Sequence, residues 1–216
     1  MKSPSWKVLL SVLTLAVAAL ACGMPDVTSL LNPLPSDNFS NSSSGWGTGT
    51  DSQSSVEYAN DGLQMVVYQP YFVTWSTPSL ESYENSHLEA TVKNDSTDPE
   101  ALFGIVCHEQ GQTNSFYYVG VSPDGYYAFV KAAEGQDDVF IKDGTSSVIT
   151  DSVASMRLGL DCGNGTLTLY VNGQQIDSIS DSTYTSGVVG LFAASDDEQS
   201  GANVTFDDFV MTKLGE

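Results

Sequence analysis

The stretch MRLGLDCGNGTLTLYVNGQQI, residues 156–176, decides the fold class. Its first run places apolar side chains at every second position: Met156, Leu158, Leu160 and Cys162. A period of two is the repeat of a β-strand with one buried face. The links CGNG (162–165) and NGQQ (172–175) supply Gly and Asn, which tolerate the positive φ of tight turns. The stretch therefore predicts consecutive antiparallel strands.

The same pattern extends in both directions from this stretch. Short runs rich in β-branched and aromatic residues recur about every ten residues, divided by Gly, Asn, Asp and Pro. The predicted strands are 56–59, 63–68, 71–76, 87–93, 102–109, 115–122, 126–131, 138–142, 155–162, 166–172, 175–179, 187–194 and 203–212. No segment after residue 35 shows a helical stripe, so we expect an all-β domain of two packed antiparallel sheets or a barrel.

Two of the three cysteines lie on apolar strand faces. Cys107 shares a face with Phe103 and Ile105, and Cys162 shares one with Leu160. In an oxidising compartment the two thiols are expected to form a disulfide across the core. The alternative is two free thiols that pack as small apolar side chains.

The third cysteine, Cys22, follows an export signal. Residues 1–21 have a basic start, an apolar run and the small-residue exit Ala19-Leu20-Ala21. The apolar run is shorter than the roughly 20 residues that a bilayer core requires, so it predicts a cleaved signal peptide. Ala-Leu-Ala-Cys also resembles a bacterial lipobox, although Ala19 replaces the commoner leucine. We expect Cys22 to be lipidated and the protein to be anchored on the outer face of a bacterial membrane; plain secretion is the alternative.

The chain is strongly acidic. Removing residues 1–21 takes away two of the seven basic residues and leaves five against 27 acidic ones, a net charge of −22. Such a charge repels nucleic acid and anionic lipid, so nucleic acid is excluded as a partner and the membrane is reached only through the anchor. Residues 22–35 carry three prolines and predict a tether, and residues 36–216 form the domain.

Four segments resemble a known family: PSDNFSNSSSGW (35–46), the centre at 102–131, the hairpin at 158–176 and the ending at 187–211. Together they resemble the concanavalin-A-like lectin and glucanase domains, or laminin-G-like jelly rolls, of bacterial lipoproteins. They also resemble the related 3-keto-disaccharide hydrolase domain. The resemblance spans residues 36–212 and implies a jelly-roll sandwich of two antiparallel sheets with a concave face that holds an extracellular glycan.

Alternation predicts which side chains line that concave face. If 102–109, 115–122 and 126–131 form a meander, one face enters the core: Phe103, Ile105, Cys107, Tyr117, Val119, Val121, Tyr127 and Phe129. The opposite face carries Gly104, Val106, His108, Phe116, Tyr118, Gly120, Tyr126, Ala128 and Val130. Small residues between aromatic ones predict a shallow carbohydrate-binding groove at Tyr118, Tyr126 and His108, joined by Trp75. The alternative is that these aromatic side chains only pack under loops.

No catalytic pattern accompanies the groove. Glucanases of the resembling family carry a Glu-x-Asp-x-x-Glu signature on one strand, and this sequence has none. The acid-rich stretches 94–100, 134–138 and 195–200 fall in predicted loops and are interpreted as solvated turns. The sequence thus favours a non-catalytic glycan-binding domain. A glycoside-cleaving enzyme and an envelope structural or protein-interaction module remain as alternatives.

A structural Ca²⁺ is the one cofactor that the sequence raises. Asp207 and Asp208 on the last strand are expected near Asp37 on the first, because the first and last strands of a jelly roll lie side by side. Carboxylate oxygens suit this hard cation. The alternative use of these acids is hydrogen bonding in turns, with no cofactor at all.

Overall fold

The computed structural model describes residues 34–78, 81–111, 113–149, 155–197 and 201–214. The predicted signal peptide and Cys22 lie outside these residues. Residues Pro35–Glu216 form one compact unit. Within the described residues, no helix is long and apolar enough to cross a membrane.

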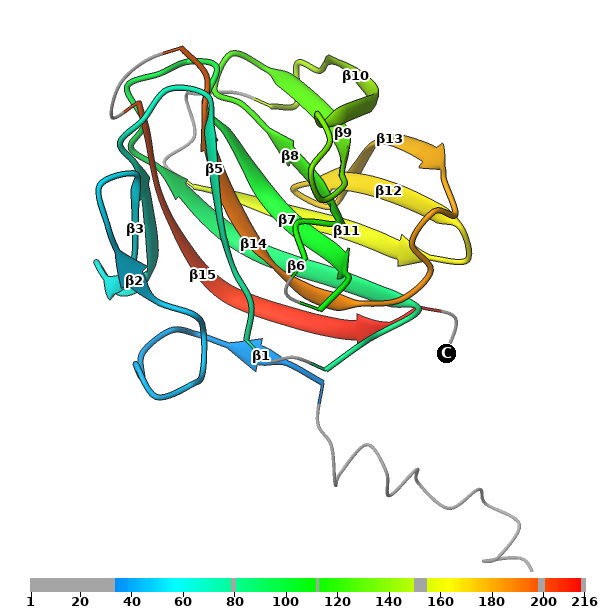
Figure 1. Ribbon diagram of the computed structural model, residues 1–216, viewed down its shortest axis with the longest axis horizontal. Coiled ribbons are helices and arrows are strands. Elements are labelled where there is room, and N and C mark those ends of the chain that lie inside the picture. Colours follow the sequence, from blue (N-terminus) through cyan, green and yellow to red (C-terminus); the bar gives the residue numbers. More distant parts are fainter. Residues whose placement is uncertain (1–33, 79–80, 112, 150–154, 198–200, 215–216) are drawn as a thin grey trace, which may run out of the picture. The chain divides into compact units, whose positions relative to one another are not determined.

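One face of the unit is a nine-stranded antiparallel sheet (Figure 1). Eight of its strands run in the order β13-β12-β11-β6-β15-β4-β3-β2, and β1 pairs with β15. Their bounds are β1 Ser36–Asp37, β2 Gly49–Thr50, β3 Ser54–Ala59, β4 Gly62–Val67, β6 Ser86–Asn94, β11 Met156–Gly163, β12 Thr166–Val171, β13 Gln174–Ser180 and β15 Ala202–Lys213. The two ends of the unit therefore lie side by side in one sheet.

The second sheet has six antiparallel strands in the order β10-β9-β8-β7-β14-β5. Their bounds are β5 Phe72–Ser76, β7 Leu102–Glu109, β8 Phe116–Val121, β9 Tyr126–Ala132, β10 Val139–Thr145 and β14 Val188–Ser195. The meander predicted from residues 102–131 is present as β7-β8-β9. The strands β5 and β10 thus form the two edges of this sheet.

The all-β sandwich is confirmed, and every strand predicted from the sequence is present with small shifts of its ends. The strands β1 and β2 were not predicted, because each has only two residues, too few to show a period of two. No helix occurs in the described part of the chain.

Side chains from both sheets fill the core. The eight residues assigned to the core face of the meander are all buried: Phe103, Ile105, Cys107, Tyr117, Val119, Val121, Tyr127 and Phe129. Cys107 of β7 is joined to Cys162 of β11 by a disulfide that links the two sheets, with Cα atoms 6.6 Å apart. This separation lies within the range that disulfides usually span. Alternation therefore assigned the inner face of the second sheet correctly.

Candidate functional site

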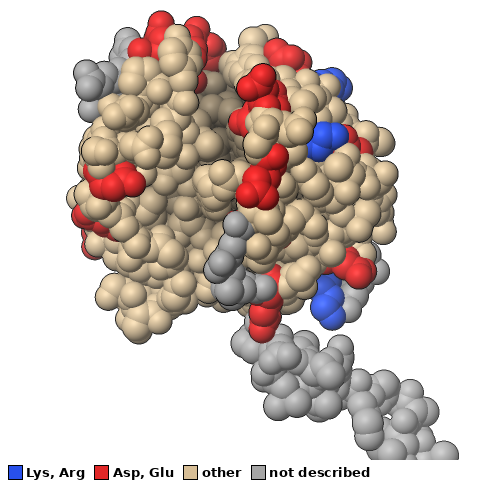
Figure 2. Space-filling model, in the orientation of Figure 1, with Lys and Arg blue, Asp and Glu red and all other residues tan. Residues whose placement is uncertain are grey.

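A cavity of about 500 Å³ opens on the outward face of the six-stranded sheet. Its lining combines aromatic rings, carboxylates and small side chains: Tyr71, Phe72, Val73, Glu100, Leu102, Tyr118, Ser122, Asp124, Tyr126, Asp138, Phe140, Ala194, Ser195 and Asp196. These residues come from β5, β7, β8, β9, β10, β14 and the loops at their ends. In Figure 2 the face is hollowed, with acidic side chains along the rim. We call this cavity the groove.

Two exposed aromatic rings stand at opposite edges of the groove. Tyr71, just before β5, is 77 % exposed, and Phe140 of β10 is 55 % exposed. Tyr71 also has a φ of 54°, which is uncommon for a bulky residue and is sustained only when its surroundings hold it. Its amide donates a hydrogen bond of 2.7 Å to the carbonyl oxygen of Asp196. The backbone of Tyr71 is therefore fixed, and the exposed ring starts from a defined position at the edge of the groove.

Tyr118 and Tyr126 contribute the polar part of the floor. The hydroxyl of Tyr118 donates a hydrogen bond of 2.6 Å to Oδ2 of Asp138, which fixes the ring against the β9–β10 loop. Burial and this carboxylate raise the pKa of Tyr118 far above its ordinary value. Burial, followed by the neighbouring Asp143, raises the pKa of Tyr126 to about 12. Both phenols remain protonated at physiological pH, so each keeps a hydroxyl at the groove.

The rest of this face is more densely filled than the sequence suggested. Beneath the groove, apolar side chains form a buried cluster: Leu102, Val106, Phe116, Tyr118, Ala128, Val130, Ala132 and Phe192. The cluster has room for the Phe192 ring because Gly120 lacks a side chain; a Cβ atom there would lie 2.7 Å from that ring. Phe192 therefore occupies the space next to Gly120, whereas Tyr118 and Tyr126 line the cavity.

Carboxylates gather at the end of the groove where three loops meet. Glu100 comes from the β6–β7 loop, Asp124 from the β8–β9 turn and Asp196 from the end of β14. The buried carboxylate of Asp98 accepts hydrogen bonds from the Glu100 amide at 2.8 Å and the Asp196 amide at 3.1 Å. The Asp124 amide donates to the carbonyl oxygen of Pro99 at 3.1 Å. One internal carboxylate and one backbone contact thus hold the three acids at one place.

Of the four residues predicted to bind carbohydrate, Tyr118 and Tyr126 line the groove. Trp75 lies on the same side of the sheet but outside the lining. Its ring packs on Phe116, with the centroids 4.9 Å apart, and its Nε1 donates to Oε1 of Glu109 at 3.4 Å. Trp75 therefore supports the cluster next to the groove.

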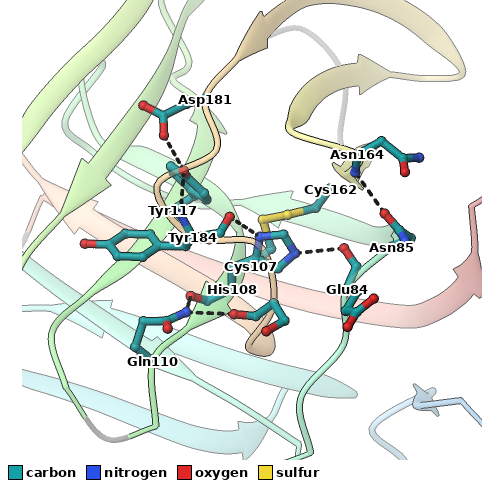
Figure 3. Close-up of a disulfide and its surroundings, with 11 residues drawn as sticks. Glu84, Asn85, Cys107, His108, Gln110, Tyr117, Cys162, Asn164, Asp181 and Tyr184 are labelled. Atoms are coloured by element: carbon teal, nitrogen blue, oxygen red, sulfur yellow. Dashed lines mark hydrogen bonds between the residues drawn. A yellow bond between two sulfur atoms is a disulfide. The ribbon is translucent and has the colours of Figure 1, made fainter.

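His108 is not on the groove face, and the reason is a β-bulge. Cys107 and His108 lie opposite the single residue Val189, because the pairing of β7 with β14 passes from Val106–Gly190 directly to Glu109–Val188. The extra residue has a φ of 55° and rotates the His108 ring toward the disulfide, as Figure 3 shows.

The ring of His108 is fully engaged there. Nδ1 lies 2.9 Å from the carbonyl oxygen of Tyr184 and Nε2 lies 3.1 Å from that of Glu84 (Figure 3). Burial lowers the pKa of His108, although the two carbonyl oxygens act in the opposite direction. His108 is a core residue, and the bulge turns Glu109 toward Trp75 in its place.

The predicted calcium ligands do not assemble. Asp37 pairs with Phe209 across β1 and β15, as expected from the adjacency of the first and last strands. However, its Oδ1 accepts a hydrogen bond from the amide of Phe39, and Oδ1 of Asp207 accepts one from Asp208. Among the described residues, the one group with metal-ligand spacing is Cys107, His108 and Cys162, whose thiols form the disulfide. Asp37 and Asp207 each accept a hydrogen bond from a nearby backbone amide, the alternative use of such acids that the sequence raised.

Several groove residues were missed by the sequence interpretation. Glu100 and Asp196 were seen only as members of acid-rich loops, because a sequence does not show that distant loops converge. Tyr71 and Phe140 were inside predicted strands, where aromatic residues are common. The available signal was the Pro70-Tyr71 pair at a strand start, which marks a turn rather than a buried position.

Comparison with known proteins identifies the fold. No family model matches the chain, and no curated protein sequence matches it. Among solved structures, the carbohydrate binding module CBM66 from Bacillus subtilis has a TM-score of 0.61 at 14% identity, covering 78% of this chain and 96% of that one. A Bacillus subtilis protein of unknown function with a galectin-like fold has a TM-score of 0.59 at 12% identity, covering 83% and 95%.

A glycoside hydrolase family 16 endo-glucanase from Bacteroides ovatus is similar as well, with a TM-score of 0.55 at 11% identity, covering 82% of this chain and 99% of that one. Sequence identities this low establish the fold alone. The fold is the jelly-roll β-sandwich of concanavalin-A-like lectins and glucanases, as the sequence resemblance implied. The same fold carries binding modules and enzymes, so the choice between them depends on the site.

Proposed function

We propose that the domain binds an extracellular glycan in the groove without cleaving it. The observation that carries the proposal is the pair of exposed rings, Tyr71 and Phe140, at the two edges of a cavity of about 500 Å³. Exposed aromatic side chains around a concave site are typical of ligand binding, because burying them on a ligand is favourable. The carbohydrate-binding and glycan-hydrolysing proteins that share the fold support the same class of ligand.

The groove offers complementary contacts for a sugar. Apolar faces of sugar rings can stack on Tyr71 and Phe140, while sugar hydroxyls can donate to the carboxylates of Asp124 and Asp138. The Tyr118 hydroxyl is already bound to Asp138, so the floor is ordered before the ligand arrives. A preorganised site loses less side-chain entropy on binding.

A glycoside-cleaving enzyme is the second candidate, and one residue favours it. Glu109 is 7 % exposed, lies beside Trp75, and has a pKa raised by burial. A carboxyl group with a raised pKa is the usual general acid of glycoside hydrolysis. However, Glu109 is not among the residues that line the groove. If the domain cleaves glycosides, it should release reducing sugar, and Glu109→Gln should abolish that release. If the domain only binds glycan, no reducing sugar should be released.

The test of binding is a glycan array followed by titration of the strongest ligand. Tyr71→Ala and Phe140→Ala should each weaken binding about tenfold, as expected for aromatic contacts central to an interface. The matched control is Val139→Ala, which removes an exposed apolar side chain from the same strand as Phe140 but outside the groove. Equal affinities for all three variants would refute the proposal, as would a folded domain that binds no glycan.

We also propose that the protein is exported and anchored through Cys22. The support is the lipobox-like Ala19-Leu20-Ala21-Cys22 sequence and the disulfide, a bond that forms in oxidising compartments. Labelling with a radioactive fatty acid should mark the wild-type chain but not Cys22→Ser, which should appear in the soluble fraction. Equal labelling of the two chains would contradict the proposal.

A further inference from the structure

The charged side chains that line the groove are all negative. Its lining contains four carboxylates, Glu100, Asp124, Asp138 and Asp196, and no lysine or arginine. The lysines on the two nearest strands are engaged elsewhere: Lys131 of β9 pairs with Asp181 at 3.0 Å, and Lys142 of β10 pairs with Asp177 at 2.6 Å. The acids of the groove therefore face an incoming ligand without a protein cation to neutralise them.

The imbalance is greatest at the end where Asp98 holds the loops. A hydrogen bond with the Asp196 side chain, followed by the charge of Asp196, raises the pKa of Glu100, and Asp124 adds to the shift. Carboxylates held this close destabilise each other's ionised form unless a cation lies between them. The backbone hydrogen bonds to Asp98 prevent Glu100 and Asp196 from separating easily.

A second observation in the same cavity is a hydroxyl group without a hydrogen-bond partner. Ser122 lines the groove and is 1 % exposed, yet its Oγ has no hydrogen-bond partner within the described part of the chain. Buried polar atoms of this kind usually find partners, so an unpaired one that lines a cavity is free to accept a hydrogen bond from a ligand. A hydroxyl oxygen is also an acceptor, like the carboxylates of Glu100 and Asp196 that line the same cavity.

We infer that this end of the groove binds the ammonium group of an amino sugar, with Glu100, Asp196 and Ser122 as its acceptors. The inference rests on the proposed glycan binding and names the class of sugar. An ammonium group has three donors and no acceptor. The site presents three oxygen acceptors and no donor side chain of Lys or Arg. The same charge disfavours sugars that carry carboxylate or sulfate groups.

The experiment compares matched ligands on the full chain, purified in detergent, by calorimetry at pH 6 and low salt. The ligands are hexamers of glucosamine and galactosamine, their N-acetylated counterparts, and an oligogalacturonate of the same length. We expect an amino form to bind at least tenfold more tightly than its N-acetylated form and the acidic oligomer not to bind. The preference should shrink as salt is raised, because exposed charges are screened.

Variants assign that preference to the acids. Glu100→Gln combined with Asp196→Asn should bring the affinities of the amino and N-acetylated forms together, while keeping binding to the N-acetylated form. Asp95→Asn is the matched control, since Asp95 is exposed on the same loop, pairs with Lys93 and lies outside the lining. It should leave the preference unchanged.

The possible outcomes distinguish failure of the ammonium site from failure of glycan binding itself. Binding of N-acetylated or acidic oligomers as tightly as amino ones overturns the ammonium site and leaves glycan binding in place. A preference that survives in the double variant also overturns it. If none of these oligomers binds and the glycan array is blank for a folded chain, glycan binding and the ammonium site are refuted together.

Discussion

Asp98 holds the acidic end of the groove together, and removing its side chain is the most informative perturbation of the structure. The residue is 1 % exposed, and both carboxylate oxygens are used. Oδ1 accepts from the Glu100 amide at 2.8 Å, and Oδ2 accepts from the Asp196 amide at 3.1 Å. Asp98→Ala removes both hydrogen bonds at once and leaves the two amides without their acceptor.

The magnitude follows from the two hydrogen bonds. A hydrogen bond to a charged group contributes about 1.5–3 kcal/mol, so losing two implies roughly 3–6 kcal/mol. Because Glu100 is exposed, water can take the place of the lost acceptor at its amide. We therefore expect Asp98→Ala to lower the unfolding free energy by about 3 kcal/mol, the lower end of this range. Asp98→Asn keeps one acceptor but presents an NH₂ group to the other amide. We therefore expect that variant to lose about half as much.

The assay is urea unfolding at pH 7 with the disulfide intact. The control is Asp95→Ala on the same loop, which removes an exposed ion pair with Lys93 and should change the unfolding free energy by about 0.5 kcal/mol. The order of stability should be wild type, then Asp98→Asn, then Asp98→Ala. An Asp98→Ala variant as stable as the control would refute the role of this carboxylate as the connection between the loops.

Three other substitutions test the contributions of the disulfide, the β-bulge and the buried Glu109 to stability. The Cys107→Ala/Cys162→Ala pair should lose about 4 kcal/mol of unfolding free energy in denaturant titrations, because the bond closes a loop with a sequence separation of 55. Gly187→Ala should lower the melting temperature, since a Cβ atom would lie 2.4–2.6 Å from the backbone of the β-bulge; Gly49→Ala, with nothing within 4 Å, is its control. Glu109→Gln should be more stable than wild type at pH 7 and no more stable at pH 4. Burial raises the folded-state pKa of Glu109, so the wild type loses stability as the pH rises through that pKa, whereas glutamine does not titrate. A pH-independent difference would contradict that cause.

The strands were predictable because a single physical rule generates them. Residues 156–176 and 102–131 alternate apolar and polar side chains, and burial of one face enforces that alternation along the whole strand. The rule identified the buried faces of β7, β8 and β9 and placed both Cys107 and Cys162 in the core. It needs only local sequence, so no knowledge of the topology was required.

The same rule failed where the backbone departs from regular pleating. At His108 the chain inserts one residue, which changes the face on which the His108 and Glu109 side chains lie. The bulge depends on the partner strand β14 and on Gly187, which are about 80 positions away in the chain. A period of two read from one strand cannot detect it.

The groove was predicted only in part for a related reason. Tyr118 and Tyr126 are in consecutive strands and could be assigned to one face from local pattern. Glu100, Asp124 and Asp196 come together only because Asp98 and Pro99 connect three loops. The sequence showed acid-rich loops, and solvation was the simpler interpretation of each loop taken alone.

The most direct test of glycan binding in the groove is to map the bound ligand onto the protein surface. The strongest glycan from the array is titrated into isotopically labelled protein, and side-chain resonances are followed by NMR. We expect the signals of Tyr71, Phe140 and Tyr126 to shift together, while Val210, an exposed side chain on the nine-stranded sheet, does not respond. Shifts centred on Val210 with an unaffected groove would contradict the assignment of the binding site.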